Sequence, residues 1–211
     1  MTVLVAVAHG TRSAAGQAQI RALADRVARR RSDLDVRLTY ADVQQPRIAD
    51  TMRGLTGAVI VPLLLSTGYH VRVDIAGAAG DARVTPPLGP DPMLTESLAR
   101  QTGNTDAVVL AAAGSSDPGW RADIGTIAGE LGAHVAYASG NHRRVPEVVA
   151  GLRRDGAERI TIAAYLLAEG LFYRSLHTAG ATRVTPPLCQ NPAIVDLVVR
   201  RFDLTVAGSR L

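Results

Sequence analysis

The sequence contains no lysine, and this absence shapes its charge. All 23 of its basic side chains are arginine, against 19 acidic ones, so the net charge is +4. Arginine binds carboxylates and phosphates through paired hydrogen bonds, although a biased genome gives the same excess without any function. Aromatic residues make up only 4% of the chain, and no basic run is interleaved with residues that stack on bases. We therefore expect no nucleic-acid partner.

Cysteine and long apolar runs are equally scarce. Cys189 is the single cysteine, which excludes an internal disulfide and a zinc site built from cysteines. No apolar run approaches the roughly 20 residues that cross a bilayer. The first apolar run starts almost at Met1 without a basic leader, which is unlike a secretory signal. We expect a cytoplasmic protein that has no membrane partner.

The chain is a doubled unit, because several of its segments recur at a nearly constant spacing. The clearest recurrence is "VTPPL", which is found in both halves of the chain. Three pairs of segments carry the repeat: "ARVTPPLGPDP" (82–92) with "TRVTPPLCQNP" (182–192), "VLVAVAHGTRS" (3–13) with "VVLAAAGSSDP" (108–118), and "VIVPLLLSTGYHVR" (59–72) with "ITIAAYLLAEGLFYR" (160–174). The repeat predicts two domains, residues 1–103 and residues 104–211.

Each half alternates short apolar strands with helical stretches. Strands are expected near residues 3–8, 35–40, 58–65 and 82–85, and again near 107–112, 133–138, 158–164 and 182–185. Helices are expected near residues 13–31, 46–54, 71–80 and 92–101, with equivalents in the second half. Such alternation predicts parallel sheets with right-handed crossovers. The expected fold class is α/β, with two similar small doubly wound lobes from an internal duplication and an active-site cleft between them.

Polar residues follow three of the expected strands in the first half. His9 ends the first strand, Asp42 follows the second, and His70 follows the third. Ligands of doubly wound sheets bind at the carboxyl ends of the strands, so these side chains are expected at one edge of one sheet. Two imidazoles with a nearby carboxylate suit Fe, Co, Ni or Zn, and the ligand types do not choose between these metals.

Other chemistries stay open for "HGTR" (9–12) when it is taken alone. Enzymes of the histidine phosphatase type carry an arginine directly before the His-Gly pair, where this chain has Ala8. Neither "HGTRSAAG" nor "AAGSSDPG" has the spacing of a nucleotide-binding loop. A histidine without chemistry is the remaining alternative, and we interpret His134, His142 and His177 in this way.

The second half serves as an internal control for the metal site. Its positions that match His9 and His70 are Ala113 and Phe172. If these histidines were needed for packing, the copy would be expected to retain polar residues there. Instead it keeps the flanking glycines and "VTPPL" while both histidines are lost. We therefore assign the site to the first half, with the second half as its other wall.

These segments resemble the sirohydrochlorin chelatase family, the small class II metal chelatases related to the cobalt chelatases of cobalamin synthesis. The resemblance rests on "AHGTR" (8–12), "DVQQP" (42–46), "PLLLSTGYHVRVDI" (62–75) and "PPLGPDP" (86–92). It covers the first half closely and the second half as a degenerate copy. The order and spacing of the four segments make the resemblance specific, which "HGTR" alone would not be.

The resemblance implies a metal chelatase, an enzyme of the lyase class. The implied reaction is ATP-independent insertion of Fe²⁺ or Co²⁺, with Ni²⁺ as a further option, into sirohydrochlorin or a related polycarboxylated tetrapyrrole. The product would serve sirohaem or cobalamin biosynthesis. The resemblance also implies that His9 and His70 hold the metal and receive the pyrrole protons. Asp42 matches the acidic position of the family and is one methylene shorter than the usual glutamate.

The implied substrate is a flat ring with acidic side chains, which arginine recognises well. We expect Arg12, Arg72, Tyr69 and Arg174 to contact it. No cofactor is expected beyond the substrate metal, and the chain is expected to be a monomer because its second lobe replaces a dimer partner. Two alternatives stay open: a non-catalytic metal- or tetrapyrrole-binding protein of the same fold, and a chelatase that acts on a different porphyrin.

Overall fold

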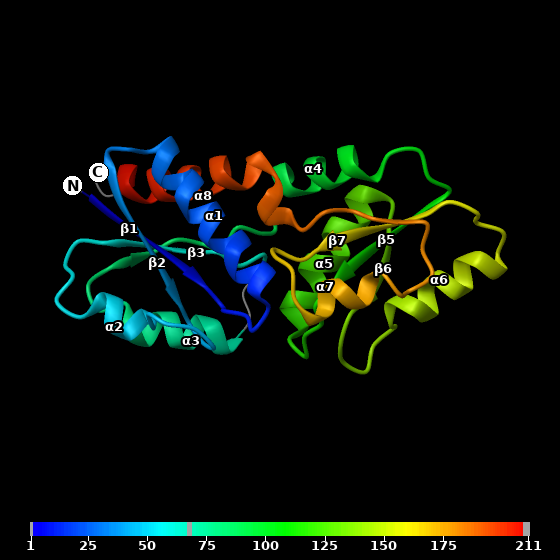
Figure 1. Cartoon of the computed structure of the whole chain (residues 1–211), viewed down its shortest axis with the longest axis horizontal. Coiled ribbons are helices and arrows are strands. Elements are labelled where there is room, and N and C mark those ends of the chain that lie inside the picture. Colours follow the sequence, from blue (N-terminus) through cyan, green and yellow to red (C-terminus); the bar gives the residue numbers. More distant parts are fainter. Residues whose placement is uncertain (1, 67–68, 209–211) are drawn as a thin grey trace. The chain divides into compact units, whose positions relative to one another are not determined.

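A computed structural model describes residues 2–66 and 69–208 of the chain, and the side chains of residues 69–72 lie outside this description. The chain forms two compact units (Figure 1). Unit 1 comprises Met1–Gly89 and Pro192–Leu211, and unit 2 comprises Pro90–Asn191. Each unit holds one four-stranded parallel sheet.

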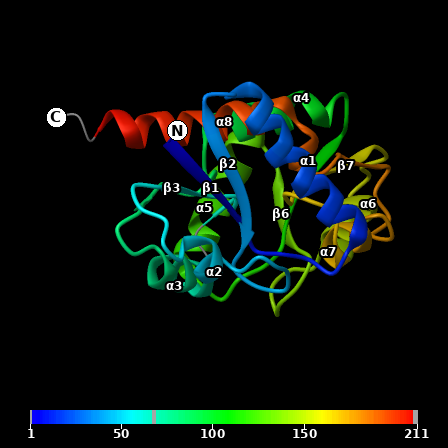
Figure 2. The ribbon, with the colours of Figure 1, turned by 60° about the vertical axis from the view of Figure 1, so that its left-hand side comes forward.

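Unit 1 has the strand order β2-β1-β3-β4, which places β1 in the interior of the sheet. Helices α1 and α8 cover one face of this sheet, and α2 and α3 cover the other (Figures 1 and 2). The bounds are β1 Thr2–Ala8, α1 Ala14–Arg30, β2 Leu34–Tyr40, α2 Ile48–Met52, β3 Val59–Pro62, α3 Tyr69–Ala78, β4 Arg83–Val84 and α8 Pro192–Ala207.

Unit 2 repeats this topology with the strand order β6-β5-β7-β8. Helix α4 packs against α5 and β7, and α6 packs against β5 and β6. The bounds are α4 Pro92–Thr102, β5 Ala107–Ala112, α5 Pro118–Leu131, β6 His134–Tyr137, α6 Val145–Arg154, β7 Ile160–Tyr165, α7 Leu171–Leu176, β8 Arg183–Val184 and a short 3₁₀ turn, Leu188–Gln190.

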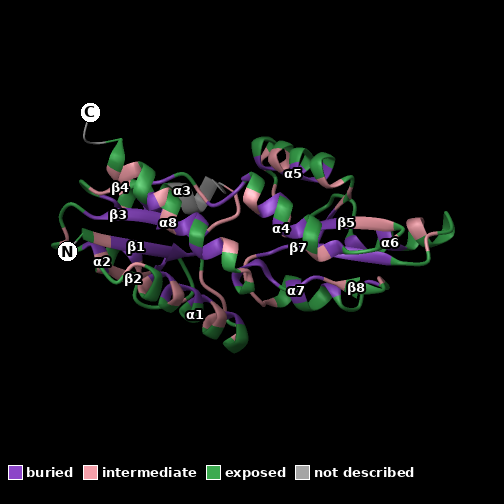
Figure 3. Ribbon diagram, turned by 90° about the horizontal axis from the view of Figure 1, so that it is seen from above, coloured by how far each residue is buried: buried purple, intermediate pink, exposed green. Residues whose placement is uncertain are grey.

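The strands are buried because both faces of each sheet are covered. Leu4, Val5 and Val7 of β1 are fully buried, and all six residues of β7 are buried (Figure 3). Strands covered on both faces read as continuous apolar runs in the sequence, as these do. The expected α/β class with two similar parallel sheets is therefore confirmed, and strands form at all eight expected places. The third and fourth strands are shorter than expected, at Val59–Pro62 and Arg83–Val84.

The compact units divide the chain differently from the two sequence halves, 1–103 and 104–211. Helix α4 follows β4 in the chain, yet it packs in unit 2, and α8 returns to pack against α1 and β3 of unit 1. The last helix of each sequence half thus covers the other half's sheet. A repeat fixes which segments are equivalent, but the apolar face of a helix fits either of two equivalent sheets. The cleft expected between the lobes stays a prediction.

None of the helices that the described residues form has the length and apolar character needed to cross a bilayer.

Candidate metal and substrate site

His9 lies at the carboxyl end of the interior strand of unit 1. The last five residues of β1 are buried, and His9 is the first residue after the strand, with an exposed side chain. Neighbouring strands β2 and β3 pair with β1 on either side. The edge where β1 ends is where parallel α/β sheets bind ligands. The sheet therefore presents this imidazole at the edge where a ligand site is expected.

Two backbone hydrogen bonds bring Asp42 beside His9. The Ala41 N–H donates to the Ala8 carbonyl and the Asp42 N–H donates to the His9 carbonyl, each at 2.9 Å. They continue the β1–β2 pairing beyond the last strand residues. Gly10, with φ +100°, permits this approach, because a Cβ there would lie 2.1 Å from the Asp42 carbonyl oxygen. The predicted neighbourhood of His9 and Asp42 is therefore present.

The Asp42 carboxylate is held through one of its oxygens. Its Oδ1 accepts hydrogen bonds from the Val43 N–H at 2.7 Å and from Arg47 Nη1 at 2.8 Å. The Arg47 guanidinium contributes most to lowering the pKa of Asp42, the Val43 N–H contributes next, and charge interaction with His9 adds a smaller part. Within the described part of the chain, no donor bonds the second oxygen, Oδ2. The carboxylate is thus an anion with one oxygen available to a cation.

Further side chains fix the turn after β1. The Thr11 N–H donates to Gln44 Oε1 at 2.9 Å, and Gln17 Nε2 donates to the Thr11 carbonyl at 2.8 Å. Ser13 Oγ accepts from the Gly16 N–H and so caps α1. Neither Gln44 nor Arg47 was predicted as a site residue from the sequence. For Arg47 a signal was available, because Arg144 occupies the same place in the second copy.

The structure describes the other predicted site residues unequally. His70 and Arg72 lie in the first turn of α3 with Tyr69, and the side chains of all three are outside the described residues. Arg12 is exposed in the turn between β1 and α1, and Arg174 is exposed on α7 of unit 2. Among side chains that are described, no three His, Cys, Asp or Glu residues are grouped closely enough to hold a metal. The pairing of His9 with His70 stays a prediction.

The matching edge of unit 2 has the same backbone but different side chains. Ser139 N–H donates to the Ala113 carbonyl at 2.9 Å, as Asp42 does to His9 in unit 1. A Cβ on Gly114 would lie 2.5 Å from the Ser139 carbonyl oxygen, so this glycine is required for the same reason as Gly10. Unit 2 thus builds the same junction between loops without an imidazole or a carboxylate.

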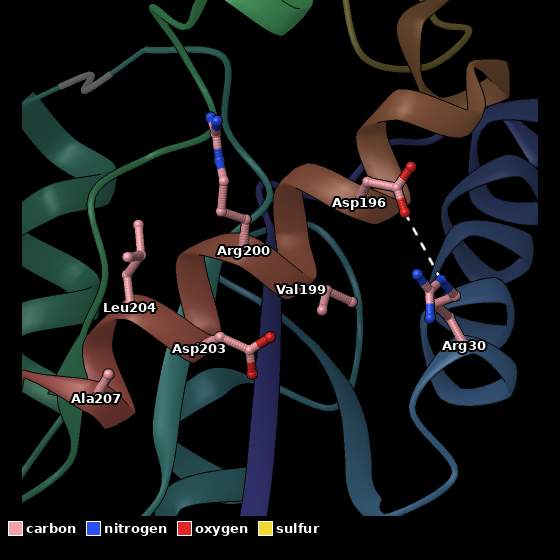
Figure 4. A pocket seen from close by; sticks show the side chains of 7 residues that line it. All are labelled: Arg30, Asp196, Val199, Arg200, Asp203, Leu204 and Ala207. Carbon is pink, nitrogen blue, oxygen red and sulfur yellow. Dashed lines mark ion pairs between the residues drawn. The ribbon is translucent and has the colours of Figure 1, made fainter.

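Unit 1 also has a surface depression (Figure 4). It is lined by α8 and by Arg30 in the last turn of α1, and Arg30 pairs with Asp196 at 3.7 Å. Neither His9 nor Asp42 belongs to its lining. Both partners of the pair are more than half exposed, so the pair adds little to stability.

Comparison with known proteins identifies the repeated sequence. The model of the CbiX family matches the chain twice, over residues 3–105 and 107–205. Sirohydrochlorin cobaltochelatases of Methanosarcina barkeri and Methanosarcina acetivorans are 27% identical over 77 and 79 residues, or 34% and 35% of this chain. These alignments span 59% and 61% of the two relatives, so the chain matches about three fifths of their length.

Solved structures share the whole fold. SirB from Bacillus subtilis with Fe³⁺ has a TM-score of 0.80 and 22% identity, covering 100% of this chain and 98% of that one. SirB of the subspecies spizizenii, described as a sirohydrochlorin chelatase in complex with cobalt, has a TM-score of 0.75 and 21% identity over 97% and 95% of the chains. CbiX, described as the terminal enzyme of siroheme biosynthesis in denitrifying bacteria, has a TM-score of 0.70 and 23% identity over 97% and 99%. At these identities the likeness establishes the fold.

Proposed function

This chain belongs to the CbiX family as two tandem copies, and we propose that it is a chelatase that inserts Fe²⁺ or Co²⁺ into sirohydrochlorin or a closely related polycarboxylated tetrapyrrole without ATP. The product would serve sirohaem or cobalamin biosynthesis. The cobaltochelatase relatives support the proposal. The observation that carries it is the exposed His9 beside the anionic Asp42 at the ligand-binding edge of the unit 1 sheet.

In this proposal His9 and His70 have different roles, metal binding and proton acceptance. The incoming metal replaces the protons on two pyrrole nitrogens, so the site must both bind a cation and accept protons. A nitrogen bonded to the metal cannot accept a proton at the same time, so one imidazole chiefly binds and the other chiefly accepts. Asp42 supplies negative charge, and its open Oδ2 is the atom that would contact the metal.

We further propose that arginines recognise the acidic side chains of the ring. Arg12 of unit 1 is exposed two residues before α1, in the same turn as His9. This location supports a role in substrate binding. Arg72, Tyr69 and Arg174 complete the proposed set of substrate contacts. Because the chain carries both family copies, we propose that it acts as a monomer. No cofactor beyond the substrate metal is required.

Metal insertion is followed directly by the visible absorption of the macrocycle. Purified protein is mixed with sirohydrochlorin and Co²⁺ or Fe²⁺, and the rate is compared with the rate without protein. We expect acceleration by the parent, a fall to the uncatalysed rate in His9→Ala and His70→Ala, and a loss of about 10-fold in Asp42→Asn. If both histidine variants insert metal as fast as the parent, the proposal is wrong.

Ala113→Ser is the matched control, because it changes the residue at the same strand end in unit 2. It is expected to retain the parent rate. A loss of activity in this variant would mean that the site is assigned to the wrong unit. A parent that binds Co²⁺ tightly but never accelerates insertion would identify a non-catalytic binding protein. Faster insertion into a porphyrin with few carboxylates would identify a different substrate.

A further inference from the structure

The loop that carries Asp42 has a counterpart of equal length in unit 2. We call residues 41–47 the acidic loop and residues 138–144 the companion loop. Each loop is followed by a helix and is closed by an isolated bridge, Tyr40 with Arg47 and Tyr137 with Arg144. The two loops therefore share their length and their closing bridge, and their differences indicate what is specific to the acidic loop.

An arginine at the end of each loop is also shared. Arg47 Nη1 donates to the Ala41 carbonyl at 3.1 Å, and Arg144 Nη2 donates to the Ala138 carbonyl at 2.7 Å. The arginine therefore bonds to the start of the loop in both units, with or without a carboxylate. Among the differences of the acidic loop are the Asp42 carboxylate, where the companion loop has Ser139, and the residue that follows it, Val43.

Val43 stands in a backbone conformation that suits glycine. Its φ is +66°, and the companion loop has Gly140 with φ +86° at this place. The Gln44 N–H donates to the Asp42 carbonyl at 2.7 Å, which makes a tight turn centred on Val43. Left-handed φ values are strained for a β-branched residue, whereas glycine adopts them without cost. The unit with the candidate site therefore keeps strain that its copy avoids.

Packing compensates this strain only in part, because the Val43 side chain is 40% exposed. The turn is tied to the carboxylate of Asp42, because the Val43 N–H donates to Asp42 Oδ1 at 2.7 Å. The Val43 Cβ also lies against the turn after β1, 3.2 Å from where a Cβ on Gly10 would be. Strain of this kind persists where surrounding contacts enforce it, and it is concentrated at functional sites.

We propose that Val43 is a positioning residue, whose strained backbone holds the Asp42 carboxylate beside His9 in the orientation needed for the metal. The inference rests on the proposed function. Glycine in place of Val43 would widen the range of backbone angles open to the turn. The carboxylate would then sample orientations in which Oδ2 no longer meets the metal bound at His9. Because Val43 acts through Asp42, it needs no contact with substrate.

The two loops provide reciprocal substitutions as a test. Val43→Gly removes the strain, so we expect Tm to rise by about 2–4 °C. The same variant is expected to lose about 10-fold in kcat/KM for Co²⁺ insertion and in Co²⁺ affinity measured by visible absorption. Val43→Ile keeps the β-branched side chain and is expected to retain the parent's kcat/KM and Co²⁺ affinity.

Gly140→Val is the matched control in unit 2. Nothing lies within 4 Å of a Cβ at Gly140, so a Cβ there adds backbone strain without a clash. We expect Tm to fall by about 2–4 °C with kcat/KM unchanged. Stability and activity then move in opposite directions in Val43→Gly, whereas only stability moves in Gly140→Val.

Two results would overturn the role of Val43. One is a Val43→Gly protein with the parent's kcat/KM and Co²⁺ affinity, and the other is a variant that loses stability and activity together, which would make Val43 merely structural. Failure of the proposed function is distinguishable, because the parent itself would not accelerate insertion. In that case, the Co²⁺ affinities of the parent, Val43→Gly and Val43→Ile would still test whether Val43 positions Asp42.

Discussion

At the scale of single residues, the close approach of the His9 turn to the Asp42 loop depends on Gly10, because glycine has no Cβ. Both glycines at equivalent junctions, Gly10 and Gly114, have positive φ and face a carbonyl oxygen of the neighbouring loop. The glycine conformation alone is common in this chain, and Gly54 has φ +74° with open space around it. Among the positive-φ glycines in the described part of the chain, Gly10 and Gly114 are the two where a Cβ would lie within 3 Å of a carbonyl oxygen.

Gly10→Ala should therefore destabilise the protein more than a comparable change elsewhere. We expect a loss of about 3 kcal/mol in the free energy of unfolding, from strain together with the clash against the Asp42 carbonyl. Gly54→Ala, which adds strain without a clash, is expected to cost about 1 kcal/mol. Urea unfolding measures both, and equal losses in the two variants would contradict the steric argument.

At the scale of elements, an exposed cluster of hydrogen bonds joins the starts of strands β5 and β7. Asp106 Oδ1 accepts from Arg159 Nη2 at 2.7 Å, and Oδ2 accepts from the Arg159 and Glu158 backbone N–H groups at 2.8 and 3.1 Å. The Arg159 side chain, and next its backbone N–H, lower the pKa of Asp106 from 3.8 to about 2. The ionised carboxylate thus helps to hold the two strands in register.

This depressed pKa predicts a pH-dependent contribution to stability. Because the pKa of Asp106 is lower in the folded protein, its contribution is complete above about pH 4 and is lost as the pH falls through about 2. Asp106→Asn should lower the urea midpoint at pH 7, and the difference from the parent should shrink between pH 4 and 2. Arg159→Gln should behave in the same way. A difference that is as large at pH 2 as at pH 7 would contradict this assignment.

At the scale of the whole molecule, the exchange of final helices decides which parts of the chain fold together. Helix α8 buries Ile194, Leu197, Val198 and Phe202 in unit 1, although it follows the last strand of unit 2 in the chain. Helix α4 likewise completes unit 2 with buried Leu94 and Leu98. A fragment cut at the repeat boundary therefore lacks the helix that covers its own sheet. It carries instead the helix that covers the sheet of the other unit.

Fragments of the chain test this division. Residues 90–191 make up unit 2 and are expected to unfold cooperatively by circular dichroism. Residues 104–211 lack α4 and expose the apolar face of α8, so we expect this fragment to melt without a cooperative transition or to aggregate. Cooperative folding of residues 104–211 as a monomer would show that the sequence half is the folding unit.

The sequence by itself determined the fold class, the duplication and the pair at the sheet edge. Alternating apolar strands and helices require parallel sheets, and the recurrence of "VTPPL" marks the two copies. His9 and Asp42 were predictable neighbours because strand ends in a parallel sheet share an edge. The aligned repeat also placed alanine where His9 stands, which assigned the candidate site to one copy. The pairing with His70 stays a prediction.

Only the tertiary structure decided which sheet each final helix covers and how Asp42 is held. Helical periodicity gives α8 an apolar face but does not say which of two equivalent sheets receives it, because the choice depends on the path of the loop before it. Glycine often marks a positive φ in a sequence, but valine does not, so the strain at Val43 is not predictable until φ is known. Both features arise from contacts between segments distant in the chain, and such contacts exist only once the chain has folded.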